Sequence, residues 1–146
     1  MKKILIVDDS PSMRMVLRYI LEQKQKPKPK AKAKSNAKPK QKQKQTETKE
    51  SYKFFEAGSE EDALMQYKKQ NPDLVLLDII MPGGDEVGLT VLKKIRGINP
   101  KAAVIMISAI GQDQTIAECT KLGAIDFIVK PFDDKEVLKV VGKTLA

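Results

Sequence analysis

Several polar residues in this sequence follow directly after apolar runs, where a buried strand would end. Four such runs are present, and the residues that end them are Asp8 and Asp9, Asp78, Ser108, and Lys130. Apolar runs of this kind are typical of strands buried in a parallel sheet. Parallel strands have their carboxyl ends at one edge, and open α/β sheets place their sites just outside that edge. The sequence therefore predicts that three carboxylates, one hydroxyl and one ammonium group share a pocket.

The chemistry predicted for this pocket is phosphoryl transfer to a carboxylate. Three carboxylates repel one another, and an all-oxygen site made by Asp8, Asp9 and Asp78 with room for water suits Mg²⁺. Asp78 ends the central run, and its carboxylate could accept a phosphoryl group as an acyl phosphate. Lys130 could then pair with one phosphate oxygen, and the hydroxyl of Ser108 could donate to another.

Each of these residues also has a simpler interpretation. Asp8 and Asp9 could cap the helix that follows them, and Asp78 could be an ordinary loop residue. Lys130 could be a solvated strand end, and Ser108 could cap a helix. Only the combination of all five favours a site over these separate explanations.

The elements that must position the pocket follow from the periodicity of the apolar residues. Strand and helix patterns alternate, which predicts an α/β three-layer sandwich around a five-stranded parallel sheet. Ser10 and Ser59 are expected to cap helices, and Gly123 is expected to end one. The predicted strands are 3–7, 52–56, 74–77, 103–108 and 125–130, and the predicted helices are 11–21, 59–70, 88–96, 113–122 and a last helix that Asp133 caps.

Residues 23–50 differ from the rest of the chain in composition. They hold eleven of the 27 Lys and Arg residues but two of the 19 acids, and they contain no Val, Ile, Leu, Met or aromatic residue. Burial of apolar surface cannot offset the entropy of ordering such a segment. We expect a disordered insertion within one domain spanning residues 1–146. The tract could bind a polyanion, although a solvating role is the simpler interpretation.

Composition excludes several classes of site. The chain has no His, which excludes His-ligated zinc and nucleophiles activated by His. Cys119 is the single cysteine, which excludes an intrachain disulfide and fits a reducing compartment; we expect it to be buried on a helix. The first apolar stretch stops at Asp8, too early for a signal peptide, and no segment is apolar over a membrane-spanning length. The expected location is the cytoplasm.

Four stretches of this sequence resemble the receiver domains of two-component response regulators, particularly the stand-alone kind similar to the chemotaxis regulator. They are residues 4–10 (ILIVDDS), 74–82 (LVLLDIIMP), 107–109 (ISA) and 123–132 (GAIDFIVKPF). The likeness covers everything except residues 23–50. It implies a flavodoxin-like receiver fold with strand order 2-1-3-4-5, the order that flavodoxin and the chemotaxis regulator share.

The resemblance also implies roles for individual residues. Asp78 would be the phosphoacceptor, and it would hold Mg²⁺ together with Asp8, Asp9 and the backbone carbonyl of Ile80.

Further implied roles concern the phosphoryl group and its readout. Ser108 and Lys130 would contact the phosphoryl group, and the peptide bond between Lys130 and Pro131 would be cis. Ser108 and Phe127 would form the switch, in which the Phe127 rotamer reports phosphorylation to the last two helices. The alternative for Phe127 is an ordinary core residue.

These implications favour a phosphorylation-controlled signalling switch that is not an enzyme beyond its own phosphorylation and slow dephosphorylation. A histidine kinase or histidine phosphotransfer protein would donate the phosphoryl group, and a downstream protein would bind through the last two helices. A Mg²⁺-dependent phosphatase of the haloacid dehalogenase kind is a second candidate, but this chain has Ile80 where such enzymes usually carry a second acid. A third candidate is a polyanion-binding protein built on an idle receiver scaffold.

Three features depart from the family pattern. The turn at 83–88 is about two residues longer than usual, so the loop beside the predicted metal site could differ. Phe127 lacks the hydroxyl of the tyrosine often found there, and residues 23–50 replace a loop that is normally short.

The predicted rim of the pocket yields a test of phosphoryl lifetime. Ile80 and Ile110 lie two residues beyond Asp78 and Ser108, and neither side chain can orient an attacking water. We expect slow loss of the phosphoryl group and faster loss in Ile80→Asn, measured as decay of the phosphorylated protein after the donor is removed. An unchanged or longer lifetime in Ile80→Asn would contradict this prediction.

Overall fold

Strands and helices alternate along the chain in the computed structural model, which describes residues 2–25, 52–79, 87–109 and 113–145. The strands are β1 (Lys2–Val7), β2 (Tyr52–Ala57), β3 (Leu74–Asp78), β4 (Val104–Ser108) and β5 (Asp126–Val129). The helices are α1 (Pro11–Gln25), α2 (Glu60–Gln70), α3 (Val87–Ile98), α4 (Asp113–Lys121) and α5 (Asp134–Leu145).

The five strands form one parallel sheet in the order β2-β1-β3-β4-β5, which confirms the predicted topology. β3 lies at the centre, and all four residues of its apolar run are buried. Because the strands are parallel, the residues that end β1, β3, β4 and β5 lie along the same edge. The sheet order thus places the ends of β1 and β4 on either side of Asp78.

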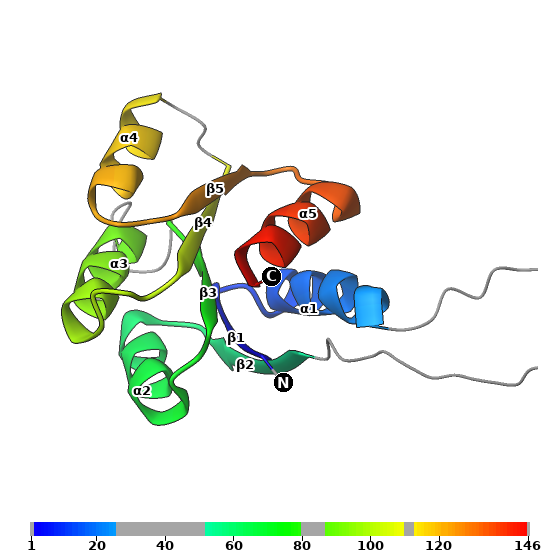
Figure 1. The fold of residues 1–146 in the computed structure, drawn as a ribbon, viewed down its shortest axis with the longest axis horizontal. Helices are drawn as coiled ribbons and strands as arrows, with labels where there is room; N and C mark the ends of the chain where they lie inside the picture. The colour runs from blue at the N-terminus through cyan, green and yellow to red at the C-terminus, as the bar shows by residue number, and fades with distance from the viewer. Residues whose placement is uncertain (1, 26–51, 80–86, 110–112, 146) are drawn as a thin grey trace, which may run out of the picture.

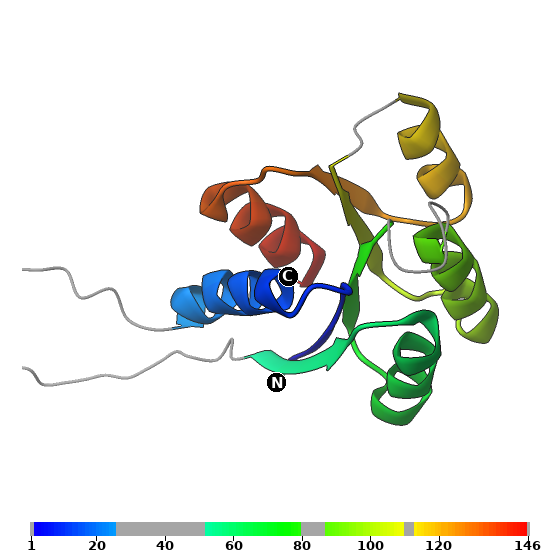
Figure 2. The same cartoon turned by 180° about the vertical axis from the view of Figure 1, so that it is seen from behind.

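Helices cover both faces of the sheet and complete three layers (Figures 1 and 2). Alternate residues of each central strand enter two separate apolar clusters, as the period of two in a strand requires. In β1, for example, Ile4 and Ile6 pack with α1 and α5, whereas Leu5 and Val7 pack with α2, α3 and α4. Cys119 is buried in the latter cluster, as predicted.

The predicted helix ends are present. Ser10 Oγ accepts a hydrogen bond from the Met13 N–H at 3.3 Å, and Ser59 Oγ accepts one from the Asp62 N–H at 3.2 Å. Asp133 Oδ1 accepts from the Glu136 N–H at 2.8 Å, which caps α5. Gly123 follows α4 with a φ of 108°, a value that glycine adopts without steric cost.

The predicted end of the first helix at Leu21 is wrong. Helix α1 continues to Gln25, four residues beyond the predicted end at Leu21. Gln, Lys and Glu are good helix formers, and extending an existing helix costs little once it is nucleated. The helix ends where Pro27 disfavours helical backbone in the preceding residue. Residues 26–51 lie outside the described residues, so disorder of the tract stays a prediction.

The prediction that residues 125–129 are buried like the other strands is also wrong. Of these residues only Ile128 is fully buried, while Ile125 is 49 % exposed and Val129 is 38 % exposed. The cause is the position of β5 at an edge of the sheet, where it has one neighbouring strand. An apolar run alone does not distinguish an edge strand from a central one.

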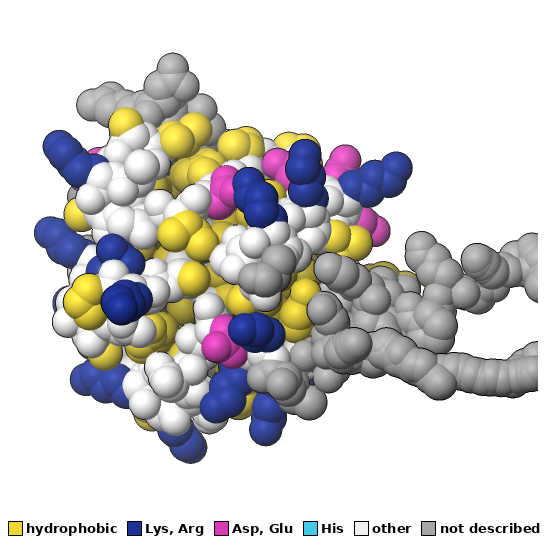
Figure 3. Space-filling model, viewed as in Figure 1, with side chains coloured by type: hydrophobic (Ala, Val, Ile, Leu, Met, Phe, Trp, Pro, Cys, Tyr) yellow, Lys and Arg dark blue, Asp and Glu magenta, His cyan; other side chains and the backbone are white. Residues whose placement is uncertain are grey.

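The charged surface of the described residues is mixed. On the face seen in Figure 3, Lys and Arg side chains spread around the periphery among apolar and acidic ones and do not gather in one patch. None of the helices in the described ranges is long and apolar enough to cross a membrane.

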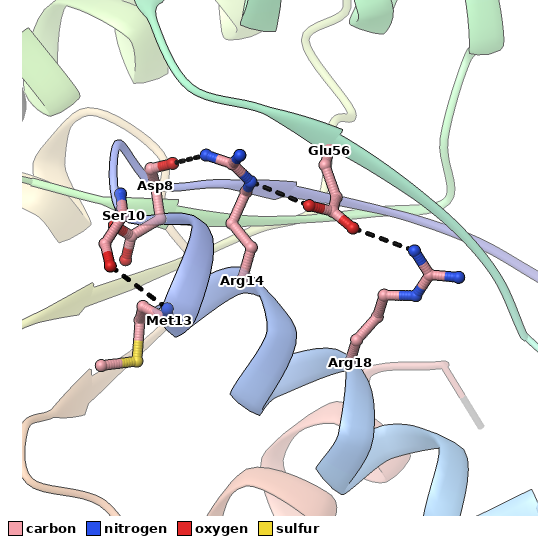
Figure 4. Close-up of polar contacts among 6 residues, drawn as sticks. All are labelled: Asp8, Ser10, Met13, Arg14, Arg18 and Glu56. Atoms are coloured by element: carbon pink, nitrogen blue, oxygen red, sulfur yellow. Dashed lines mark hydrogen bonds and ion pairs between the residues drawn. The ribbon is translucent and has the colours of Figure 1, made fainter.

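Two arginines of α1 form ion pairs with Glu56 near the end of β2 (Figure 4). Arg14 Nε lies 2.9 Å from Glu56 Oε1, and Arg18 Nη1 lies 2.9 Å from Glu56 Oε2. Burial alone would raise the pKa of Glu56, but the hydrogen bonds and positive charges of Arg14 and Arg18 outweigh it and lower the pKa. The ionised carboxylate is therefore favoured in the folded state.

This lowered pKa makes part of the stability depend on pH. The contribution of Glu56 is complete above its unfolded pKa of about 4.3 and is lost as the pH falls through the lower folded value. We expect wild type to be more stable than Glu56→Gln near neutral pH. The difference in their free energies of unfolding should narrow as the pH falls below about 4. Urea unfolding across this pH range measures this difference.

Glu118→Gln, at an exposed position on α4, is the matched control. Its difference from wild type in the free energy of unfolding should change less with pH. A wild-type advantage over Glu56→Gln that stays constant down to the lowest pH would contradict the assignment.

Candidate functional site

Three carboxylates converge at the carboxyl edge of the sheet. Asp78 ends β3 and is 6 % exposed, while Asp8 follows β1 and is 3 % exposed. Asp9 is exposed beside them. One oxygen from each of these three side chains lies within 4.8 Å of the other two.

Lys130 extends an ammonium group toward two of these carboxylates. Its Nζ lies 3.4 Å from Asp78 Oδ2 and 3.6 Å from Asp8 Oδ2, and the Lys130 side chain is 22 % exposed. Ser108 ends β4 next to Asp78 and is completely buried. The backbones of Lys130 and Ser108 are also hydrogen-bonded, because the Lys130 N–H donates to the Ser108 carbonyl at 2.8 Å.

Strand register explains why residues far apart in sequence meet here. Val7 is paired with Leu77, so the residues that follow them, Asp8 and Asp78, emerge side by side. Asp78 is in turn paired with Ile107, the residue before Ser108. The pocket is a direct consequence of the sheet order β1-β3-β4-β5.

The start of α3 lies against the end of β3. The Gly88 N–H donates to the Ile79 carbonyl at 2.9 Å, and a Cβ at position 88 would collide with the backbone of Asp78 and Ile79. Glycine is therefore required for this close approach. The contact fixes the backbone on one side of Asp78.

Asp8 is held by both backbone and side-chain bonds. Its N–H donates to the Ala57 carbonyl at 3.0 Å, extending the β1–β2 ladder by one residue. Its Oδ1 accepts from the Ser10 N–H at 2.8 Å, while its Oδ2 faces Lys130. The carboxylate is thus oriented toward the pocket by the loop that it begins.

The donor set fits a divalent cation. Three carboxylates with one ammonium leave two negative charges uncompensated among Asp8, Asp9, Asp78 and Lys130. Oxygen ligands from an exposed and two buried acids, open to solvent on one side, match the coordination that Mg²⁺ prefers. Asp8, Asp9 and Asp78 are the described residues that could hold it.

The structure disfavours the simpler interpretations of these residues. Lys130 contacts two carboxylates, so it is not merely a solvated strand end. The α1 cap is supplied by Ser10 Oγ at the Met13 N–H, so Asp9 is not needed for it. Ile80, Ile110 and the longer turn lie outside the described residues, and their predicted roles stay predictions.

Two further predictions concern Pro131 and Phe127. The peptide bond between Lys130 and Pro131 is cis. Phe127 on β5 is partly buried and packs against the apolar cluster shared by α2, α3 and α4. Its place in this cluster agrees with the core interpretation, and its role as a switch stays a prediction.

Sequence reasoning missed Arg14, which donates to the Asp8 carbonyl, and Glu56, which pairs with Arg14 (Figure 4). Arg14 stands four residues after the Ser10 cap, and Glu56 is an acid on a strand otherwise rich in aromatic residues. The available signal was a pair of arginines at positions i and i+4 of α1, together with an acid on the face of β2 that α1 covers.

Comparison with known proteins agrees with this geometry. The sequence model of the response regulator receiver domain matches residues 40–142. Chemotaxis protein CheY of Bacillus subtilis is 38 % identical over 143 residues, which cover 98 % of this chain and 97 % of that protein. Sporulation initiation phosphotransferase F of the same organism is 33 % identical and covers 99 % of this chain and 94 % of its own.

Solved structures give the same result. The crystal structure of a CheX–CheY–BeF3–Mg²⁺ complex from Borrelia burgdorferi matches with a TM-score of 0.76 and 32 % identity, covering 99 % of this chain and 90 % of that one. The receiver domain of NtrX from Brucella abortus matches with a TM-score of 0.74 and 27 % identity, covering 97 % of each chain. From its fold, its acidic pocket and these relatives, the chain belongs to the receiver domain family of two-component response regulators.

Proposed function

We propose that the chain is a phosphorylation-dependent switch that accepts a phosphoryl group on Asp78 in the presence of Mg²⁺. The carrying observation is the convergence of three carboxylates within 4.8 Å of one another, with Lys130 Nζ at 3.4 Å from Asp78. Asp78 alone of the three ends the central strand, between the ends of β1 and β4. It is therefore within reach of Asp8 on one side and of Ser108 on the other.

The proposed step is an in-line displacement. A carboxylate oxygen of Asp78 attacks the phosphorus of a phosphohistidine on the donor, and an O–P bond forms as the P–N bond breaks. The electron pair of the broken bond passes to the imidazole nitrogen, which leaves as neutral imidazole when its other nitrogen carries a proton. The product is an acyl phosphate on Asp78.

The residues around Asp78 compensate the charge that this step brings in. Lys130 supplies a mobile positive charge for a phosphoryl oxygen, and Ser108 Oγ can donate to another. Mg²⁺, when bound by Asp8, Asp9 and Asp78, lowers the repulsion between the carboxylates and the incoming phosphoryl group. The chain itself contributes positioning and electrostatics, and no side chain acts as a general base.

The phosphodonor must be another molecule, because this chain has no histidine. We propose a histidine kinase or a histidine phosphotransfer protein, acting in the cytoplasm. An open pocket of about 380 Å³ next to the site offers an apolar surface to such a donor; it is lined by Met13, Val16, Ala109, Lys130, Pro131 and Phe132. The switch would not turn over substrates as an enzyme does.

The proposed output runs through β5 to the last two helices. Phe127 on β5 is paired with Met106 on β4, and β4 ends two residues after Met106, at Ser108. A shift of Ser108 toward a phosphoryl group would displace Phe127 and the apolar cluster that it shares with α4, and α5 follows β5 directly in the chain. A downstream protein would bind these last two helices. Contact of the lysine tract with a polyanion stays a separate proposal.

The first test is labelling with a small phosphodonor. We expect wild type to take up at most one phosphoryl group per chain in a Mg²⁺-dependent way, and Asp78→Asn to take up none, because the amide is not a nucleophile of the required kind. Intact-protein mass spectrometry measures the added group. Asp62→Asn, at an exposed position on α2, is the matched control and should label like wild type.

Continued release of phosphate from a phosphomonoester, in place of labelling that stops at one group, would favour the phosphatase alternative. Equal labelling of Asp78→Asn and wild type would exclude Asp78 as the acceptor. No labelling of wild type would favour the idle scaffold.

A second test concerns the ammonium group. Lys130→Met removes the positive charge near Asp78 and Asp8, so we expect labelling to slow by about a hundredfold, the order found when one stabilising donor is lost from an active site. The measurement is the initial labelling rate at saturating Mg²⁺. Lys143→Met, on the exposed end of α5, is the control and should leave the rate unchanged.

A labelling rate in Lys130→Met equal to that of wild type would contradict the role of Lys130.

A further inference from the structure

Arg14 connects the backbone of a predicted metal ligand to β2. Its Nη1 donates to the Asp8 carbonyl oxygen at 2.5 Å, and its Nε donates to Glu56 Oε1 at 2.9 Å (Figure 4). The side chain is 17 % exposed, so most of it is enclosed between α1 and β2. None of the roles described above uses this contact.

Glu56 holds Arg14 in this orientation. Glu56 lies on β2 opposite Ile6, two residues before Asp8 in the neighbouring strand. Its second oxygen accepts from Arg18 Nη1, so the carboxylate is held by two ion pairs. The guanidinium of Arg14 therefore has one side occupied by Glu56 and directs its other side to Asp8.

We propose that Arg14 is a positioning residue of the magnesium site, oriented by Glu56; this inference rests on the proposed function. With its N–H bonded to Ala57 and its carbonyl bonded to Arg14, the backbone of Asp8 is fixed on both sides. The Asp8 side chain is then held between the Ser10 N–H and Lys130, facing the cation position. Groups that orient metal ligands in this way alter metal affinity when they are changed.

Charge balance explains why the pair consists of an arginine and a glutamate. A lone cation next to Asp8 would repel Mg²⁺, whereas Glu56 offsets the charge of Arg14 at close range, and Arg18, which shares Glu56, is paired in turn with Glu22 at 3.7 Å. The guanidinium also offers several donors in a fixed planar arrangement, so it can hold a carboxylate and a carbonyl at once. A lysine at position 14 would keep the charge but lose this geometry.

The experiment is calorimetric titration of the unphosphorylated full chain with Mg²⁺. We expect Arg14→Lys to raise the Kd by about tenfold, and Arg18→Lys to change it by less than about twofold, because Arg18 shares Glu56 but does not contact Asp8. Urea unfolding of each variant separates a loss of affinity from a loss of folding, since a merely structural role would lower stability and leave the Kd of the folded protein unchanged.

Gly58→Ala tests the same contact without changing any charge. A Cβ at position 58 would lie 3.1 Å from Arg14 Nη1, so the guanidinium would have to shift by a few tenths of an ångström. We expect the Kd for Mg²⁺ to rise in this variant as well. This measurement keeps the inference testable if Arg14→Lys does not fold.

The outcomes separate this inference from the proposed function. If wild type binds no Mg²⁺, both are overturned. If wild type binds Mg²⁺ and labels on Asp78, but Arg14→Lys and Gly58→Ala keep the wild-type Kd, only the positioning role is overturned. An equal rise in Arg18→Lys and Arg14→Lys would also overturn it, because the effect would then not depend on contact with Asp8.

Discussion

The repulsion among three carboxylates at one edge of a sheet is the constraint on which this molecule depends. Two of them are almost completely buried, where unpaired charge is costly, and the nearby ammonium of Lys130 offsets only one charge. The arrangement is therefore stabilised by added positive charge. Under the proposed function, a bound cation and a phosphoryl group would both change the charge balance of this pocket, which would give a small fold an electrostatic input.

The fold and the location of the pocket could be predicted from the sequence because both depend on local patterns. Asp8, Asp78 and Ser108 end apolar runs, and a parallel sheet brings such ends together whatever the loops between them contain. The order of the strands came from family resemblance, since an apolar run does not specify its neighbours. For the same reason the exposure of Val129 on β5, and of Ile125 just before it, was not foreseen.

Other features could not be predicted because they depend on packing between distant elements. The contact between Arg14 and Glu56 requires a particular position of α1 over β2, two elements that flank the longest connection in the chain. The end of α1 was misplaced because the helix continues beyond its last apolar residue. The Gln and Lys residues there have adequate helix propensity, but they show no apolar periodicity that would predict a helix. The structure thus brings Asp8, Asp9, Asp78 and Lys130 together as predicted, while the contact of Arg14 with the Asp8 backbone was missed.

Helix α1 runs from the reactive edge to the opposite edge, and β2 begins at that opposite edge, with Tyr52 beside Lys2. The lysine-rich segment is therefore attached at the edge of the sheet opposite Asp78. A fold joined in this way can accept an added sequence, or a whole binding module, at the remote end while the reactive end keeps its geometry. Such a junction would allow tethering to another structure to evolve independently of signalling chemistry, in one polypeptide.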